Sequence, residues 1–475
     1  MEAGMRMPLG DVLPELVLLG GGVLVLFFAL FTPRRWQPAA AALALAVVLA
    51  AALATLPLFG AEQALTFADT YALDGAALWA KLIVLLIVAL TILLSVEWFR
   101  ADARHGEYYT LLLFSGLGAL LLAGATDLMQ MVLAVLLSSA TGYVLAAYHR
   151  RSKPAGEAAI KYYLLGAITN GVLAYGVVLF LGVGGTTVYA GLVRGLPAAS
   201  PWVAGAALGM VTIGLAFKMG AVPAHAWMPD VAEGTPAPVA AFLTTAAKVG
   251  ALVALARVAL LFPETGLGWR PLLAVLAAAT MTLGNLACLW QDDVRRLLGW
   301  SAVSQTGYGM MALVALGRSE LAVPALLFFL LAYALGNLAA FGVVVELRGL
   351  TDRAAYAGLA RSRPWLLLAL VLAFLSFIGI PPLAGFPAKL ALFGATIEAG
   401  YTWLAVLAVV NTVVSLFYYA RVIGPAFFER AAPAPQPLLG GWAATATALA
   451  TLGVVALGLG AEPFLHWFAE ARLLP

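Results

Sequence analysis

Long apolar runs separated by short polar segments dominate the pattern of this chain. A helix needs about 20 apolar residues to cross a bilayer, and fourteen stretches come close to that length or exceed it. We place them at approximately 12–32, 38–58, 74–97, 108–125, 127–148, 158–182, 201–224, 237–261, 271–290, 298–317, 321–346, 365–396, 402–424 and 438–460. No long polar domain interrupts them. The pattern predicts an all-α integral membrane protein with a single transmembrane domain, residues 1–475.

Two of these stretches contain prolines where a continuous helix would run. The first is Phe217–Asp230 and the second is Gly379–Lys389. Proline removes a backbone donor and clashes with the preceding turn. In a membrane, the freed backbone is tolerated only inside protein or beside a water-filled cavity. We expect both helices to be interrupted, near Pro223–Pro229 and Pro381–Pro387, with carbonyl groups freed into the interior.

The two interrupted stretches are the seventh and twelfth predicted helices, five spans apart. Corresponding broken helices at that spacing are typical of transporters built from inverted repeats. We therefore predict two inverted five-helix repeats, helices 4–8 and 9–13. The expected divisions are 1–107 for the first three helices, 108–262 and 270–425 for the repeats, and 426–475 for helix 14.

Composition and loop charge agree with a membrane protein and give it an orientation. Hydrophobic residues make up 63% and charged residues 10%, against about 45–50% and about 25% in soluble proteins. The single cysteine, Cys288, rules out a disulfide within the chain. Loops after odd-numbered helices carry most of the basic residues: Arg34, Arg35, Arg100, Arg104, Arg150, Arg151, Lys153, Arg295, Arg296, Arg348, Arg353, Arg361, Arg363 and Arg430. The positive-inside rule then places both termini on the outer side.

Three lysines fall inside predicted helices: Lys218 and Lys389 beside the breaks, and Lys248 near the middle of helix 8. Ionisable residues at bilayer depth are costly and usually mark a transport path. Desolvation favours the neutral amine, so a buried lysine can take up and release a proton near neutral pH. His225, in the first break, titrates there without help. The alternatives are a kinked structural helix for Lys218 and a packing role for His225. Lys81, near the outer end of helix 3, is expected to snorkel.

The sequence lacks the motifs that several kinds of catalysis and binding require. It has no metal-ligand constellation, no glycine fingerprint for nucleotides, no cysteine spacing for iron–sulfur clusters and no hydrolase motif. We expect no redox catalysis by this chain alone, and no nucleic acid partner.

Six segments give the chain a resemblance to a known family. They are Glu157–Ala167, Phe217–Asp230, Gly234–Val239, Arg296–Ser301, Gly379–Lys389 and Asn411–Tyr419. With them, the chain resembles the antiporter-like membrane subunits of respiratory complex I, and among these subunit N, from Leu13 to about Arg430. The resemblance implies a proton path in which Lys218, Lys248 and Lys389 match the lysines of helices 7, 8 and 12. It also implies that Glu157 and Lys161 match a pair at the start of helix 6.

The chain departs from this family at two positions on the implied path. The family usually has a glutamate in helix 5, where alignment on Tyr148 puts Leu136. It also tends to have a histidine in helix 10 where this chain has Gln305, whose amide can hold water but cannot carry a proton as an ion. We therefore expect Lys218 to have no Asp or Glu within salt-bridge distance, with Glu157 and Asp230 as the residues that could overturn this. We also expect Leu136→Glu to supply the missing partner.

The sequence thus predicts a proton-translocating subunit of a complex I-type NADH:quinone oxidoreductase in a prokaryotic cytoplasmic membrane. Its expected partners are other membrane subunits, the lipid bilayer and protons. NAD, FMN, iron–sulfur clusters and quinone are expected in partner subunits, with no cofactor in this chain. One alternative is a subunit of a multisubunit cation/proton antiporter or membrane-bound hydrogenase. Another is a structural rung that fills the membrane arm without moving protons.

Overall fold

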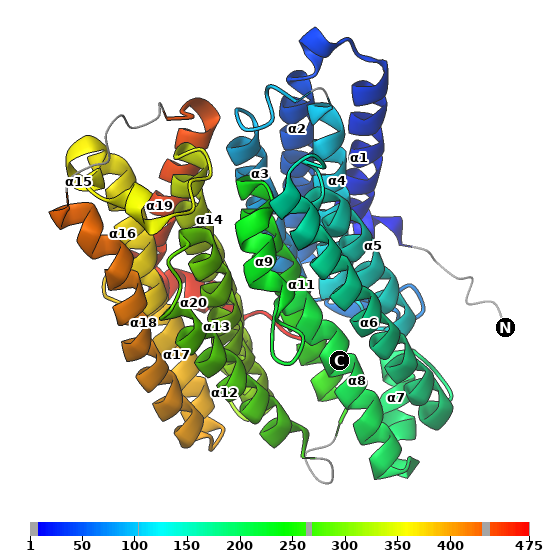
Figure 1. Cartoon of the computed structure of the whole chain (residues 1–475). Helices are drawn as coiled ribbons and strands as arrows, with labels where there is room; N and C mark the ends of the chain where they lie inside the picture. Colours follow the sequence, from blue (N-terminus) through cyan, green and yellow to red (C-terminus); the bar gives the residue numbers. More distant parts are fainter. Residues whose placement is uncertain (1–7, 103, 263–267, 430–437, 475) are drawn as a thin grey trace.

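The computed structural model describes residues 8–102, 104–262, 268–429 and 438–474, which form a bundle of roughly parallel helices (Figure 1). Arg430, one of the loop arginines above, lies outside these residues. The longer helices are α1 (Leu13–Phe31), α2 (Ala39–Thr55), α3 (Gly75–Ser95), α4 (His105–Gly124), α5 (Leu128–Ala146), α6 (Lys153–Gly184), α8 (Pro201–Met219), α11 (Ala246–Leu260), α12 (Trp269–Cys288), α13 (Val294–Ala315), α14 (Ala322–Glu346), α16 (Pro364–Ile378), α17 (Gly385–Glu398), α18 (Thr402–Phe428) and α19 (Gly441–Leu459).

Shorter elements connect or extend these helices. They are the α-helices α7 (Tyr189–Gly195), α9 (Trp227–Gly234), α10 (Ala237–Leu243), α15 (Leu359–Ser362) and α20 (Ala461–Ala469), the 3₁₀ turns η1 (Leu9–Val12), η2 (Arg34–Trp36), η3 (Leu56–Gly60), η4 (Leu196–Ala198) and η5 (Arg353–Tyr356), and the strands β1 (Ala64–Thr66) and β2 (Tyr71–Leu73). The strands pair antiparallel in register Ala64 to Leu73. This small hairpin is the one departure from the predicted all-helical fold within the described residues.

Each predicted span coincides with a helix or an interrupted helix. Among the described residues, 12 helices are long and apolar enough to cross a membrane by themselves. The two predicted spans outside that set are α13 and the pair α16–α17. α13 is long enough, but its first twelve residues include Arg295, Arg296, Ser301, Ser304 and Gln305. α16 and α17 are each short because the predicted break divides them.

Both breaks lie where the prolines predicted them. α8 ends at Met219 and α9 begins at Trp227, while α16 ends at Ile378 and α17 begins at Gly385. A glycine with positive φ ends the first half of each helix: Gly220 at 71° and Gly379 at 92°. This left-handed conformation is open to glycine but costs other residues about 1–2 kcal/mol.

A third break was not predicted. The span 237–260 is divided into α10 and α11 at Thr244 and Thr245, just before Lys248. The two hydroxyls donate to the carbonyls of Ala240 and Ala241, at 2.8 and 2.7 Å. Threonine hydroxyls compete with backbone donors in this way and distort helices. Consequently each of the three lysines lies beside a helix break.

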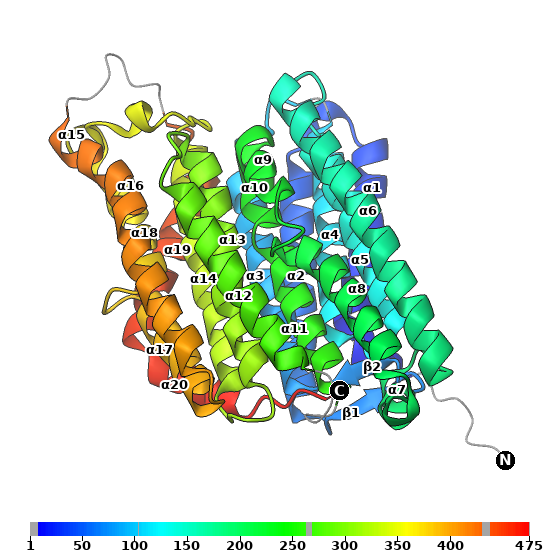
Figure 2. The same cartoon turned by 60° about the horizontal axis from the view of Figure 1, so that its bottom comes forward.

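The helices alternate in direction, so both described chain ends reach the same side of the bundle, which we call the terminal face (Figure 2). We call the opposite side the basic face, since the arginine-rich loops lie there. At the terminal face, the last residues pack onto the start of α3: Ala76 N donates to Arg472 O at 3.0 Å. The span 237–260 and helix α14 are almost wholly buried, whereas α1, α6 and α18 expose apolar side chains, as expected beside lipid.

Candidate functional site

The buried lysines define the candidate site. Lys218, Lys248 and Lys389 are at most 4% exposed, so none faces lipid, as the sequence predicted. They come from α8, α11 and α17, helices in the central and C-terminal parts of the bundle (Figures 1 and 2).

Lys218 has a neutral hydrogen-bond partner. Its Nζ donates to Ser138 Oγ of α5 at 3.1 Å. Within the described residues, no carboxylate lies within 4.0 Å of this amine, so the prediction that Lys218 lacks an acidic partner is confirmed. The two residues that could have overturned it, Glu157 and Asp230, instead bind Lys161.

The position of Leu136 contradicts the expectation that residue 136 faces Lys218. Its side chain is 43% exposed, on the outer side of α5, whereas Ser138 is 3% exposed and faces Lys218. Successive helical residues are about 100° apart, so positions 136 and 138 point in nearly opposite directions. The expectation that a glutamate at position 136 would supply the partner of Lys218 is therefore wrong for this fold.

Lys248 is held between α13 and α14. Its Nζ donates to the carbonyl of Ala302 at 2.6 Å and lies 4.2 Å from the centre of the Tyr333 ring. A cation over an aromatic face is attracted by the ring's quadrupole, more strongly when water is excluded. Lys248 is thus positioned by a carbonyl and a ring.

Lys389 has the same kind of surroundings. Its Nζ donates to Ile378 O and to Thr412 Oγ1, both at 3.3 Å, and lies 4.1 Å from the centre of the Tyr308 ring. Ile378 is the last residue of α16, so its carbonyl is one of those freed by the break. Gln305 donates to Phe377 O, one residue earlier, at 3.3 Å.

A threonine hydroxyl lies between the backbone next to Lys218 and the carbonyl that binds Lys248. The carbonyl of Met219, at the end of α8, accepts a hydrogen bond of 2.7 Å from Thr306 Oγ1. The same hydroxyl lies 3.0 Å from the Ala302 carbonyl that binds Lys248. One threonine therefore bridges the backbone beside one lysine and the acceptor of the next.

A small cavity lies beside Lys389. Tyr333, whose ring contacts Lys248, lines it together with Gln305 and Lys389. Its volume of about 10 Å³ is enough for roughly one water molecule. We call the row of Ser138, Lys218, Thr306, Lys248, Tyr333, Gln305 and Lys389 the lysine line. That polar side chains or waters link at least two of the lysines stays a prediction, since the Lys218 amine donates to Ser138 and Lys248 does not line this cavity.

Glu157 and Lys161 belong to a separate cluster at the basic face. Lys161 Nζ lies 2.7 Å from Glu157 and 3.2 Å from Asp230, and Arg296 Nη1 lies 2.6 Å from Asp230 and 2.7 Å from Glu233. These residues line a cavity of about 160 Å³. Lys161 and Glu157 are largely exposed, so this cluster is in contact with solvent whereas the lysine line is not.

His225 lies in the first break, half-buried, with its ring 5.6 Å from that of Trp300. Its Nδ1 is buried and has no hydrogen-bond partner in the structure. It is therefore placed between the basic face and the α8 break, but no hydrogen bond of its ring joins it to the lysine line.

Sequence reasoning missed several members of the site. Ser138, Thr306, Tyr333, Tyr308 and Thr412 are ordinary residues of apolar helices, and nothing in their spacing marks them. Lys81 was interpreted wrongly: it is fully buried and lies 3.0 Å from Glu15. Snorkelling was expected because the sequence could not show that α1 brings a carboxylate to it.

Comparisons with known proteins identify the family of this chain. A family described as NADH:quinone oxidoreductase/Mrp antiporter, TM, matches residues 125–415. NADH-quinone oxidoreductase subunit N of Mycobacterium sp. (strain JLS) is 42% identical over 454 residues, which cover 94% of this chain and 96% of that protein.

Solved structures give the same result. A chain of respiratory complex I from Thermus thermophilus has a TM-score of 0.82 at 32% identity, covering 97% of this chain and all of its own length. A chain of the Mrp complex from Dietzia sp. DQ12-45-1b shares the fold at a TM-score of 0.85 and 23% identity, covering 98% and 97%. On the family match and the relatives that it resembles along nearly its full length, this chain belongs to the NADH-quinone oxidoreductase subunit N family.

Proposed function

We propose that this chain translocates protons within an NADH-quinone oxidoreductase, and that Lys218, Lys248 and Lys389 relay them. The observation that carries the proposal is the lysine line, in which three buried amines lie near freed carbonyls, hydroxyls and a water-sized cavity. Every amine in it has neutral acceptors. A buried charge without a counter-charge is costly, so each amine can lose its proton more readily than a salt-bridged lysine.

The remaining candidate residues have roles at the start of the path and between the lysines. Glu157 and Lys161, with Asp230, Glu233 and Arg296, form a solvated charged cluster at the basic face. By the positive-inside rule this face is cytoplasmic and both termini lie outside. In this arrangement the cluster collects protons from the cytoplasm, His225 passes them toward Lys218, and Gln305 orients water between Lys248 and Lys389.

The redox chemistry belongs to partner subunits in this proposal. NAD, FMN, iron–sulfur clusters and quinone would be bound there, and other membrane subunits would cover part of the apolar outer surface. The complex would lie in a prokaryotic cytoplasmic membrane. A multisubunit antiporter is the alternative assembly, and the subunits that purify with the chain in mild detergent distinguish the two, since only the first has flavin and iron–sulfur partners.

A structural rung that does not move protons is the second candidate function. It is favoured by one observation: Lys218 lacks the acidic partner that would hold and release its charge. The three buried lysines argue against it, since apolar residues would fill the same positions at no electrostatic cost.

Methionine substitutions separate these functions. Lys218→Met and Lys389→Met keep the apolar stem and delete the charge, so the complex should assemble and oxidise NADH while proton uptake into proteoliposomes falls. Lys153→Met is the matched control, since Lys153 is exposed at the start of α6. Pumping at the wild-type level in both buried-lysine variants would establish the structural rung instead.

A further inference from the structure

A second buried acid–base pair lies far from the lysine line, near the terminal face. Glu15 Oε1 of α1 is 3.0 Å from Lys81 Nζ of α3, and the two side chains are 5% and 0% exposed. Tyr71 of β2 donates its hydroxyl to the same Oε1, and its ring centre lies 5.0 Å from the amine. Within the described residues, this is the one lysine–carboxylate pair in which both groups are fully buried.

This pair is not fully hydrogen-bonded. Glu15 Oε2 is buried without a partner, and Lys81 Nζ makes no hydrogen bond of proper geometry despite its three donors. Nearly all buried polar groups in proteins are satisfied, so an exception calls for a bound water, an ion or a catalytic role.

A neighbouring pair shows what a structural ion pair looks like here. Arg257 and Asp74 are completely buried and bind each other through two hydrogen bonds of 2.7 and 2.8 Å. Asp74 also accepts from the backbone of Ala77 and Leu474, and Arg257 also donates to carbonyls of Ala123 and Leu474. Both carboxylate oxygens of Asp74 and all three guanidinium nitrogens of Arg257 are hydrogen-bonded, whereas Oε2 of Glu15 is not.

Few other charges surround Glu15. The charges of Asp74 and Arg257 neutralise each other, because the two side chains form an ion pair. Helix α2 contains no titratable residue, and those of α4 lie in its first five residues, at the basic face. Besides Glu15, Lys81 and Tyr71, the charged groups around the pair among the described residues are Asp11 of η1, four residues before Glu15, and the Asp74–Arg257 pair beside Tyr71.

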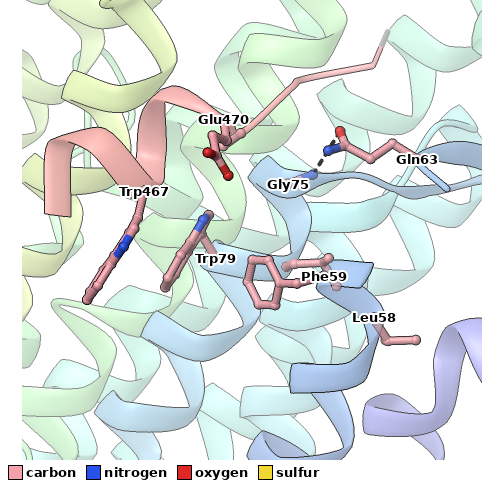
Figure 3. Close-up of a pocket in the computed structure, with 9 residues that line it drawn as sticks. Leu58, Phe59, Gln63, Gly75, Trp79, Trp467 and Glu470 are labelled. Carbon is pink, nitrogen blue, oxygen red and sulfur yellow. Dashed lines mark hydrogen bonds between the residues drawn. The ribbon is translucent and has the colours of Figure 1, made fainter. Parts of the chain in front are cut away.

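A cavity at the terminal face borders the start of α3, and Glu15, Lys81 and Tyr71 are not among the residues that line it. This cavity, of about 340 Å³, is lined by Gln63, Gly75, Leu78, Trp79, Trp467 and Glu470, among others (Figure 3). Gly75, Leu78 and Trp79 belong to the first turns of α3, so the cavity borders the helix within two turns of Lys81. Glu470 is exposed and places a carboxylate in this cavity.

We propose that Glu15 and Lys81 form a proton-binding site reached from the terminal face, separate from the lysine line. A proton from water forms an O–H bond with the free Oε2 of Glu15, while Oε1 keeps the hydrogen bond from Tyr71. Lys81 keeps its own proton, so the ion pair is replaced by a neutral carboxyl group beside the Lys81 ammonium group. Release of the proton to the cavity restores the pair.

Carbodiimide labelling of the assembled complex tests this proposal. Dicyclohexylcarbodiimide is apolar and reacts with protonated carboxyl groups, and peptide mass spectrometry locates the adducts. Glu15 should be labelled, with a rate that rises about tenfold per unit fall in pH while the carboxylate form predominates. Asp74 is the internal control, equally buried but saturated, and should stay unlabelled. Lys81→Met removes the counter-charge, which favours the neutral acid, so labelling of Glu15 at neutral pH should increase by about tenfold or more.

Three results would overturn the proposal. They are no adduct on Glu15 at any pH at which the complex stays intact, equal labelling of Glu15 and Asp74, or no increase in an assembled Lys81→Met complex. If that variant does not assemble, the comparison of Glu15 with Asp74 in the wild-type complex decides alone. The assay reports proton occupancy rather than transport, so its outcome is independent of whether the lysine line pumps.

Discussion

At the scale of single residues, the acceptors of the three lysines are neutral: Ser138 for Lys218, Ala302 O for Lys248, and Ile378 O with Thr412 for Lys389. Rings of Tyr333 and Tyr308 add attraction for the charged form without fixing it as a carboxylate would. In the proposed relay, an amine held this way can pass its proton on without breaking an ion pair. In that proposal, the lack of a glutamate in helix 5 weakens the binding of a proton by Lys218 but does not interrupt the proton path.

Position 138 tests this view of Lys218. Ser138→Asp puts a carboxylate beside the amine, and a nearby opposite charge favours the charged lysine. The lysine should then release its proton only at higher pH, so the pumping rate at neutral pH should fall and its optimum should move to alkaline pH. Ser138→Asn, similar in size and neutral, is the control and should leave the optimum in place.

Leu136→Glu provides the opposite comparison. Its side chain lies on the outer side of α5, and a carboxylate there should leave the pH optimum of pumping unchanged. A shift of the optimum in Leu136→Glu but none in Ser138→Asp would contradict the placement of Lys218.

At the scale of elements, helix breaks make the site. Each break releases backbone groups that an intact helix would use internally, and the lysine line binds them: Met219 O, Phe377 O and Ile378 O all accept hydrogen bonds from side chains. The breaks after α8 and α16 depend on glycines with positive φ, Gly220 and Gly379.

Gly379→Ala should disturb the second break. Gly379 has φ of 92°, and a Cβ there would lie 3.2 Å from Lys389 Cδ. We expect a loss of about 1–2 kcal/mol in stability, measured as a lower thermal unfolding midpoint of the purified assembly, together with reduced pumping. Gly394→Ala, in the middle of α17 with its nearest neighbour at 3.9 Å, should be neutral or slightly stabilising. Equal midpoints in the two variants would contradict the role of Gly379.

Some helix breaks and site contacts can be predicted from the sequence, and others cannot. The prolines predict the breaks after α8 and α16, because proline disrupts a helix through its own backbone. Long apolar runs predict the membrane spans. Thr244 and Thr245 broke the next span through hydroxyl bonds that the sequence does not reveal. Ser138, Thr306 and Tyr333 became site residues only because α5, α13 and α14 pack beside the lysine helices. The partner of Lys81 was missed for the same reason: Glu15 reaches it from another helix.

At the scale of the whole molecule, Arg472 and Leu474 bind the start of α3 at the terminal face. Leu474 N donates to Asp74 at 2.8 Å, and Leu474 O accepts from Arg257, so the last residues complete the buried Asp74–Arg257 pair. The Cα of Ala471 would lie 2.6 Å from a Cβ at Gly75, which shows how closely this segment crosses α3.

Removal of residues 472–475 should therefore destabilise the fold. It leaves buried polar groups of Asp74 and Arg257 without partners, at a cost of about 1–3 kcal/mol per group, seen as a lower thermal midpoint of the purified assembly. Arg472→Ala changes only an exposed side chain and keeps the backbone bonds, so it should match wild type. A truncated chain as stable as wild type would show that the segment does not support the pair.

The most direct test of the lysine line is the number of protons moved per electron by the assembled complex carrying Lys248→Met. Lys248 is the middle amine and is completely buried. Loss of a proton-transfer group costs about 10²–10⁴-fold in the step that it serves, so the protons carried by this chain should be lost almost entirely while NADH oxidation continues. The ratio should fall in Lys248→Met and remain at the wild-type value in Lys153→Met. An unchanged ratio in an assembled, electron-transferring Lys248→Met complex would contradict the account.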